Sequence, residues 1–256
     1  MNARIASPAR GLRWLAEGWR MFRAAPLSWL ALVFGYWLAR AIIGRVPVLG
    51  MVAASVLVPA FSVGFMAASR AASLRQPLEV PMLVAGFRER LPAQLVLGAA
   101  YFAGLALAIG GSMLADDGVL ARWMLTGQSP GNEAEAKGVL GAIGVAAALY
   151  LPVMMMLWFA PLLVAWHAMA PAQALFYSFV ACWLNWRAFL AYALAVAFIT
   201  FLLPSAALLL LSLVSGGALH VSPMALMLPL LLILLPTLLA SFYASYRDVF
   251  EAKEGA

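Results

Sequence analysis

Six apolar stretches divide this chain, and each is long enough to cross a lipid bilayer as an α-helix. About 20 residues of helix span the roughly 30 Å of hydrocarbon in a membrane. The candidate spans cover residues 27–43, 48–69, 93–114, 139–169, 188–214 and 224–246. Because only helices and closed barrels satisfy every backbone polar group in lipid, such stretches restrict the fold class severely. We predict an all-α integral membrane protein with six transmembrane helices.

The composition supports lipid as the main solvent of this chain. Hydrophobic residues make up 66% of it and charged residues 10%, whereas a soluble domain carries about 25% charged residues. The first 25 residues are too long and too charged for a cleavable signal, so we expect them in the mature protein. A single cysteine, Cys182, excludes an internal disulfide.

Basic residues flank the spans unevenly. With the N-terminus inside, the outer segments hold only Arg40, Arg45, Arg122 and Lys137. The inner segments hold the other Lys and Arg residues, at positions 4, 10, 13, 20, 23, 70, 75, 88, 90, 187, 247 and 253. Cytoplasmic segments carry such an excess. We predict a multi-pass protein of the bacterial inner membrane with both termini cytoplasmic. The basic residues that give the net charge of +6 then serve to orient the chain in the membrane. We therefore expect no nucleic-acid partner.

Residues 8–23 have the pattern of an amphipathic helix. One face carries apolar side chains at helical spacing, at Leu12, Leu15, Trp19 and Phe22. The opposite face carries charged side chains, at Arg10, Arg13, Glu17 and Arg20. Such a helix lies flat in the membrane interface. We predict amphipathic helices of this kind on the cytoplasmic side.

Parts of the second, fourth and sixth spans resemble one another. Residues 56–70 read VLVPAFSVGFMAASR, and residues 233–247 read ILLPTLLASFYASYR. WFAPLLVAWHAMAPA, residues 158–172, is a weaker copy, and Pro59, Pro161 and Pro236 align. Composition alone could make apolar spans similar, but aromatic and basic residues precede each pair of spans. We predict a single membrane domain, 1–247, with a parallel threefold repeat of interfacial helix plus two-span hairpin. The units are 8–70, 80–170 and 171–247, and a short cytoplasmic tail, 248–256, follows.

Small residues recur within two of these spans. Ala60, Gly64 and Ala68 are spaced four residues apart, and Ser241 and Ser245 repeat the pattern in the sixth span. Small side chains at this spacing allow helix backbones to approach closely. The predicted packing or kink positions are therefore Pro59, Ala60, Gly64, Ala68, Pro161, Pro236, Ser241 and Ser245.

The spans lack the ionisable groups that membrane transporters and enzymes use. No Asp or Glu lies well inside a span, which argues against a carboxylate proton relay and an intramembrane aspartyl or metal hydrolase. Asp116 and Asp117 stand at the end of a span, where we expect them to be solvated. His167, His220 and Cys182 do not have zinc-ligand spacing. We therefore predict no catalytic residue, no metal site, no cofactor and no enzymatic activity.

Arginines beside aromatic residues at the inner interface are candidates for lipid headgroup contacts. They are Arg13, Arg20, Arg23, Arg88, Arg90 and Arg187, with Trp14, Trp19 and Trp186 as interfacial anchors. Asn185 could either cap the fifth span or hold a headgroup. The expected partners are anionic membrane lipids, and partner membrane proteins or a homo-oligomer remain open.

Three functions follow, in order of preference. The first is a non-enzymatic membrane protein that binds lipids or partner membrane proteins, as a scaffold or envelope factor. The second is a small uniporter or channel for an amphipathic solute, with its path between the even-numbered spans. The third is an enzyme that uses a polar cluster in the outer loop, residues 116–137.

Several motifs together resemble a known family. GLRWLAEGWRMFRAAPLSWL, LVPAFSVGFMAASR, FAPLLVAWHAMAPAQALFYSFVACWLNWRAFLAY and YASYRDVF are similar to an uncharacterised family of six-span inner-membrane proteins of β-proteobacteria, labelled only "transmembrane protein". The resemblance covers nearly the whole chain and implies location and fold, with no catalytic residues. More loosely, the layout is similar to the membrane domain of some glycerophosphodiester phosphodiesterases. Since this chain has no soluble catalytic domain, that likeness implies no activity.

Overall fold

The computed structural model describes residues 3–215 and 223–250. Within these ranges every regular element is a helix and no strand occurs. His220 and Lys253 lie outside the described residues. Helices long and apolar enough to cross a membrane cover Pro26–Ile43, Leu91–Asp116, Glu133–His167, Trp186–Val214 and Leu228–Phe250. A bent pair, Leu49–Val56 with Val58–Ser73, makes a sixth when it is counted as one span. The prediction of an all-α chain with several helices of membrane-spanning length is confirmed for the described residues.

The chain forms two compact units, which we describe separately. The first comprises Met1–Ala39, Val63–Ala85 and Ala181–Ala256, and the second comprises Arg40–Ser62 and Gly86–Val180. The first unit holds α1 (Pro8–Ala24), most of α2 (Pro26–Ile43), the end of α4 (Val58–Ser73), η1 (Val80–Val84), α11 (Trp186–Ala197), η2 (Phe198–Leu202), α12 (Leu203–Val214) and α13 (Pro223–Phe250). The second holds α3 (Leu49–Val56), the start of α4, most of α5 (Ala85–Arg88), α6 (Leu91–Asp116), α7 (Val119–Thr126), α8 (Glu133–Trp158), α9 (Ala160–His167) and most of α10 (Pro171–Leu184).

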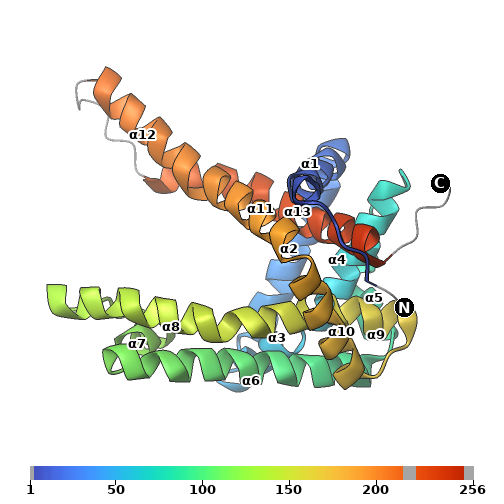
Figure 1. The fold of residues 1–256 in the computed structure, drawn as a ribbon, viewed down its shortest axis with the longest axis horizontal. Helices are drawn as coiled ribbons and strands as arrows, with labels where there is room; N and C mark the ends of the chain where they lie inside the picture. The colour runs from blue at the N-terminus through green and yellow to red at the C-terminus, as the bar shows by residue number, and fades with distance from the viewer. Residues whose placement is uncertain (1–2, 216–222, 251–256) are drawn as a thin grey trace. The chain divides into compact units, whose positions relative to one another are not determined.

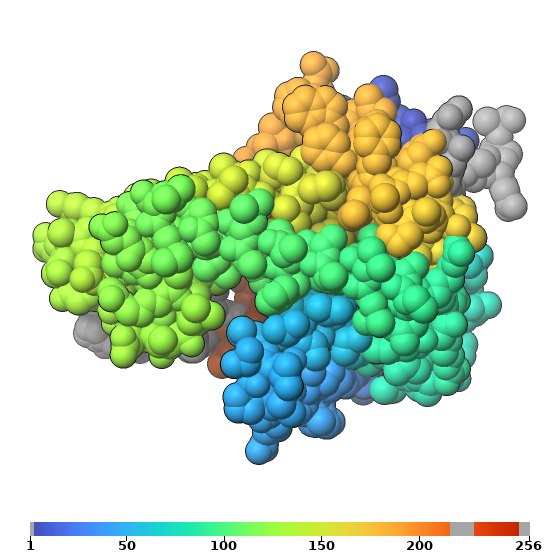
Figure 2. Space-filling model, turned by 90° about the horizontal axis from the view of Figure 1, so that it is seen from below, coloured from blue at the N-terminus to red at the C-terminus, as the bar shows by residue number. Residues whose placement is uncertain are grey.

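The second unit is built on a hairpin of two long helices. Helices α6 and α8 lie side by side (Figure 1). A Cβ added at Gly104 of α6 would overlap the side chain of Val153 on α8. Helix α3 packs on α6 as well (Figure 2), where a Cβ at Gly98 would overlap the carbonyl oxygen of Val56. Glycine on α6 therefore permits close contact with both neighbours.

Two of the three aligned prolines follow a break in a helix. Helices α3 and α4 meet at Leu57, two residues before Pro59, with a bend of 41°. Helices α8 and α9 meet at Phe159, two residues before Pro161. Proline cannot donate to the carbonyl one turn back, and its ring crowds that carbonyl. Helix α13, in contrast, continues through Pro236.

A serine from α10 forms hydrogen bonds on both sides of the break between α8 and α9. The Oγ of Ser178 donates to the carbonyl oxygen of Met155 at 2.7 Å and accepts from the backbone N–H of Phe159 at 2.9 Å. In an uninterrupted helix, that N–H would bond to the Met155 carbonyl directly. The hydroxyl is thus inserted into the helical hydrogen-bond ladder, a recognised cause of kinks. Ser178 is fully buried.

The segment between α6 and α8 is more ordered than the sequence suggested. Asp116 is 8% exposed, so the prediction that it is solvated is wrong. Its carboxylate accepts from the N–H of Gly118 at 3.0 Å and from that of Leu120 at 2.6 Å, which satisfies the start of α7. Helix α7 packs on α8 through an apolar cluster of Val119, Leu120, Val139 and Ala142.

Candidate functional site

Helix α1 packs directly on α11 and α13. A Cβ added at Gly11 would overlap the carbonyl oxygen of Ala188 on α11, and one added at Gly18 would overlap that of Thr237 on α13. Only glycine allows backbones to come this close. Helix α1 is consequently an integral part of the first unit.

The apolar face of α1 is divided between protein and surface. Leu15 and Phe22 are buried in the unit, together with Trp14 and Met21. Leu12 and Trp19 are 52% and 40% exposed, although they belong to the same predicted face as Leu15 and Phe22. Only the edge of this face that carries these two side chains is exposed.

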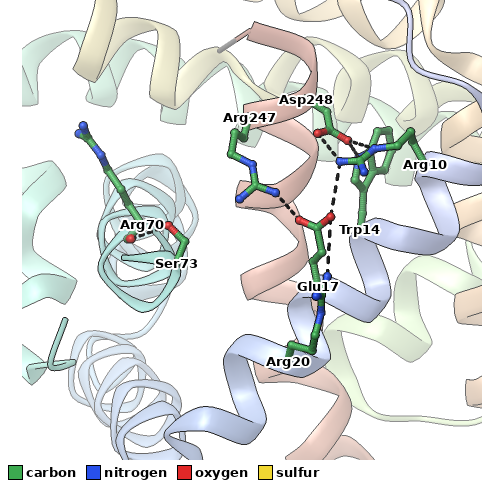
Figure 3. Close-up of polar contacts among 8 residues, drawn as sticks. All are labelled: Arg10, Trp14, Glu17, Arg20, Arg70, Ser73, Arg247 and Asp248. Carbon is green, nitrogen blue, oxygen red and sulfur yellow. Dashed lines mark hydrogen bonds and ion pairs between the residues drawn. The ribbon is translucent and has the colours of Figure 1, made fainter. Parts of the chain in front are cut away.

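The charged face of α1 meets the last turns of α13 (Figure 3). The Nε of Arg10 donates to Asp248 Oδ2 at 2.5 Å, and its Nη2 pairs with Asp248 Oδ1. The indole N–H of Trp14 donates to the same carboxylate at 2.7 Å. Glu17 pairs with Arg247 through Oε2 and lies 3.5 Å from Arg10 through Oε1. We call Arg10, Trp14, Glu17, Arg247 and Asp248 the α1–α13 cluster.

Both carboxylates of the α1–α13 cluster are largely shielded from water. The side chains of Glu17 and Asp248 are 14% and 13% exposed. Arg20 lies at the edge of the cluster, with Nη2 4.0 Å from Glu17 Oε1 and a side chain that is 67% exposed. Ion pairs with this little exposure are screened less than surface pairs. Since arginine occupies both acids, the cluster holds helices together and offers no free base.

Asn185 fixes the segment that precedes α1. Its Nδ2 donates to the carbonyl oxygens of Arg4 and Ala181, both at 2.9 Å, and its Oδ1 accepts from the N–H of Ala6 at 2.6 Å. The N–H of Arg4 donates to the carbonyl oxygen of Val249 at 2.9 Å. Asn185 makes no side-chain cap on α11 and is 1% exposed. Asn185 thus stands at the predicted N-cap position of α11 without a side-chain capping bond, and the interpretation as a headgroup contact is wrong because the side chain is buried.

All six arginines proposed as headgroup contacts have exposed side chains, at Arg13, Arg20, Arg23, Arg88, Arg90 and Arg187. Helix α1 brings three of them together. The guanidinium of Arg187, in the first turn of α11, lies 5.4 Å from the ring centre of Trp186, which is 51% exposed. Arg88 and Arg90, at the end of α5 and before α6, belong to the second unit. Trp14 is fully buried, so of the three predicted interfacial anchors Trp19 and Trp186 keep an exposed surface.

The small residues singled out by spacing are buried. In the first unit, a Cβ at Gly64 would overlap the carbonyl oxygen of Leu83. Ser241 lies against Gly18, and its Oγ shares a 2.7 Å hydrogen bond with the hydroxyl of Tyr192. In the second unit, Ala60 contacts the position that a Cβ at Gly86 would occupy. Ala68 and Ser245 are also buried.

Some of the remaining polar groups make structural contacts. Over residues 3–215 and 223–250, no group of three His, Cys, Asp or Glu side chains could hold a metal ion. Glu135, in the loop region considered for an enzyme, accepts from the N–H of Gly131 at 2.9 Å and lies 3.7 Å from Arg122. The exposed arginines are among the groups that can meet an external ligand, and the ligand that they suit is an anion.

Helix α13 extends further than the sequence suggested. It runs to Phe250, so Asp248, which the prediction placed in the tail, lies in its last turns. Nothing in the sequence links Asp248 to Arg10, because 238 positions separate them. This is the contact that sequence reasoning missed.

Comparison with known proteins provides one extended match. A protein of Burkholderia thailandensis that carries the name "Probable inner membrane protein" is 37% identical over 255 residues, with 97% of this chain and 93% of that protein covered. No family model matches, and no solved structure matches. The looser similarity to glycerophosphodiester phosphodiesterases finds no support. With near-complete coverage and several apolar helices of membrane-spanning length, this chain belongs to the family of that Burkholderia protein and is a multi-pass inner-membrane protein.

Proposed function

We propose that this protein is a non-enzymatic membrane protein that binds anionic lipids and acts as a scaffold or envelope factor. The observation that supports this function is the exposed strip of α1, made of Leu12, Arg13, Trp19, Arg20 and Arg23. Leu12 and Trp19 form one row along the helix, and Arg13 and Arg20 form a second row beside it. Arg23 falls between the two rows. The strip thus places apolar and cationic side chains next to each other.

Such a strip suits the boundary between acyl chains and headgroups. Tryptophan prefers that level of the membrane, while guanidinium groups bind phosphate through paired hydrogen bonds. A basic residue near an anionic membrane surface contributes about 1 kcal/mol. Three such residues would strengthen the preference for anionic lipid by about 3 kcal/mol, or roughly a hundredfold in affinity. Arg10 and Arg247 are excluded from this role because Glu17 and Asp248 occupy them.

Further arginines extend the proposal to the other interfacial segments. Arg187 with Trp186 forms a second arginine–tryptophan pair, and Arg88 and Arg90 are exposed in the second unit. We propose that all of these meet the cytoplasmic leaflet. The uneven distribution of basic residues, which favours cytoplasmic termini, supports this orientation.

Recurring contacts favour the threefold repeat, which we also propose. Gly18 touches Thr237, and Gly86 touches Ala60; each contacted residue directly follows one of the aligned prolines. In the third case Ser178 of α10 bonds to Met155 and Phe159, just before Pro161 and not to the residue that follows it. In each case a small residue of the segment before a hairpin meets the second span of another hairpin. This recurrence involves contacts that similar composition alone does not produce.

The lipid proposal is tested by lipid retention in native mass spectrometry. Full-length protein would be purified in detergent and offered phosphatidylglycerol or phosphatidylcholine. We expect the wild type to retain phosphatidylglycerol preferentially, and the triple variant Arg13→Gln, Arg20→Gln, Arg23→Gln to lose most of that preference. Arg122→Gln, which removes an exposed arginine from α7, serves as the matched control and should behave as the wild type. Equal retention of both lipids by the wild type, or an unchanged triple variant, would refute the proposal.

One observation favours the uniporter or channel alternative. Broken membrane helices are typical of transporter binding sites, and the helices are broken at Leu57 and at Phe159. The break at Phe159, however, is filled by the Ser178 hydroxyl. Solute uptake into proteoliposomes decides between the two functions, since a lipid-binding scaffold should add no flux to that of empty vesicles.

A further inference from the structure

The two ends of the chain meet at α1 and α13. The backbone of Arg4 bonds to that of Val249, and Arg10 pairs with Asp248. Other interfacial helices are joined to the preceding span by a short connection, six residues from α4 to η1 and three from α9 to α10. No such connection leads from α13 to α1. This junction must be held entirely by non-covalent contacts.

The absence of a connecting loop gives the α1–α13 junction a larger entropic cost. A short loop holds two neighbouring elements close before they pack, whereas the pairing of Arg10 with Asp248 must close a loop of 238 positions. The cost of closure rises with the logarithm of loop length. Charge-assisted hydrogen bonds are stronger than neutral ones, and the α1–α13 cluster has several. When Gly18 is matched with Gly86, since each touches the residue after an aligned proline, Glu17 corresponds to Ala85, which cannot form such bonds.

We infer that the α1–α13 cluster is a seam, by which we mean a set of ion pairs that holds two helices far apart in the sequence against each other. Through this seam α1 docks on α13 late in assembly. Helix α1 is synthesised well before α13. Until α13 arrives, the side of α1 around Gly18, which packs on Thr237 and Ser241 of α13, needs another partner. The membrane interface provides one, because α1 has the pattern of an interfacial helix. Docking then exchanges lipid for protein on the buried side and leaves the α1 strip at the surface.

Thiol accessibility tests this inference in the full-length protein, in membrane vesicles with the cytoplasmic face outside. The native thiol would be removed by Cys182→Ala. The reporter is Ser245→Cys on α13, which is 1% exposed and lies between Ser241, packed on Gly18, and Asp248. The matched control is Ser69→Cys on α4, which is also fully buried in the first unit. Each hydroxyl donates to a carbonyl of its own helix, at 2.7 Å.

The perturbation is the pair Glu17→Gln and Asp248→Asn, which keeps the shapes of both side chains and removes their charges. Because the opening of a docked element depends on its local free energy, we expect labelling of Ser245→Cys by a water-soluble maleimide to rise on the order of tenfold. Labelling of Ser69→Cys should not change. If Ser245→Cys stays protected, apolar packing alone holds α1 and the seam is refuted. If both cysteines react faster together, the unit unfolds as a whole, which also contradicts a local seam.

Salt provides a second readout that needs no change in the cluster. The arginines of the cluster are 25% and 39% exposed, so salt should weaken their ion pairs. Raising the salt concentration should increase labelling of Ser245→Cys when the charges are present, and should have little effect after Glu17→Gln and Asp248→Asn. Equal salt dependence in both backgrounds would show that the ion pairs do not control the opening.

Discussion

The hydroxyl of Ser178 is the contact whose removal the structure predicts most sharply. Replacement by alanine removes the 2.7 Å bond to the Met155 carbonyl and the 2.9 Å bond from the Phe159 N–H. Both Ser178 and Phe159 are buried, so water cannot replace the lost partner. Ser178→Ala should therefore leave a buried donor unsatisfied.

Two known magnitudes set limits on the free energy of unfolding that Ser178→Ala should lose. A buried donor without a partner costs about 1–3 kcal/mol, while single side-chain hydrogen bonds in membrane proteins average about 0.6 kcal/mol. Two bonds lost at one site, with one donor left unpaired, give about 2 kcal/mol. Ser69→Ala is the matched control, because Ser69 is equally buried but bonds only to the Phe65 carbonyl. That carbonyl keeps its helical N–H, so the control should cost less than about 0.6 kcal/mol.

Equilibrium unfolding of the full-length protein in mixed micelles, followed by circular dichroism, measures both changes. The free energies of unfolding of the two variants should differ by more than about 1 kcal/mol, which is about a fivefold change in the unfolding equilibrium constant. Equal losses in Ser178→Ala and Ser69→Ala would show that the hydroxyl does not hold the break, and that the role given to Ser178 is mistaken.

Two further predictions concern the docking of α1. Gly11→Val should destabilise the protein by about 2 kcal/mol, because the new side chain meets the Ala188 backbone; a neutral effect in the same unfolding assay would contradict this contact. Trp14→Phe should cost about 2 kcal/mol through loss of its bond to the Asp248 carboxylate, whereas Trp19→Phe should stay within about 0.5 kcal/mol. Similar losses in the two tryptophan variants would contradict the division of α1 into buried and exposed sides.

The sequence predicted the spans well because the signal for a span is local. Hydrophobicity over about 20 residues defines it, and the helices 26–43, 91–116 and 186–214 contain or closely follow the predicted ranges. Proline also marked helix breaks at Phe159 and Leu57, two residues upstream. It failed to do so at Pro236, where the helix continues. Helix continuity depends on neighbouring packing, which one span does not reveal.

The sequence predicted only part of the candidate site. Helical periodicity correctly gathers Leu12, Leu15, Trp19 and Phe22 on one side, but it cannot distinguish contact with lipid from contact with protein. The same periodicity groups Arg10 with Arg13, although Arg10 is held by Asp248 and Arg13 is exposed. Charges at opposite ends of a chain leave no joint pattern in a single sequence. Only the fold separates the arginines that hold α1 in place from those that remain available to a ligand.

The most direct test is an experimental density map of the full-length protein in nanodiscs that contain phosphatidylglycerol. The account predicts phosphate density within hydrogen-bonding distance of Arg13, Arg20 or Arg23, with Leu12 and Trp19 at the start of the acyl region. Arg10 and Arg247 should remain on their carboxylates. A strip that faces water, with lipid phosphates held elsewhere, would contradict the proposed function.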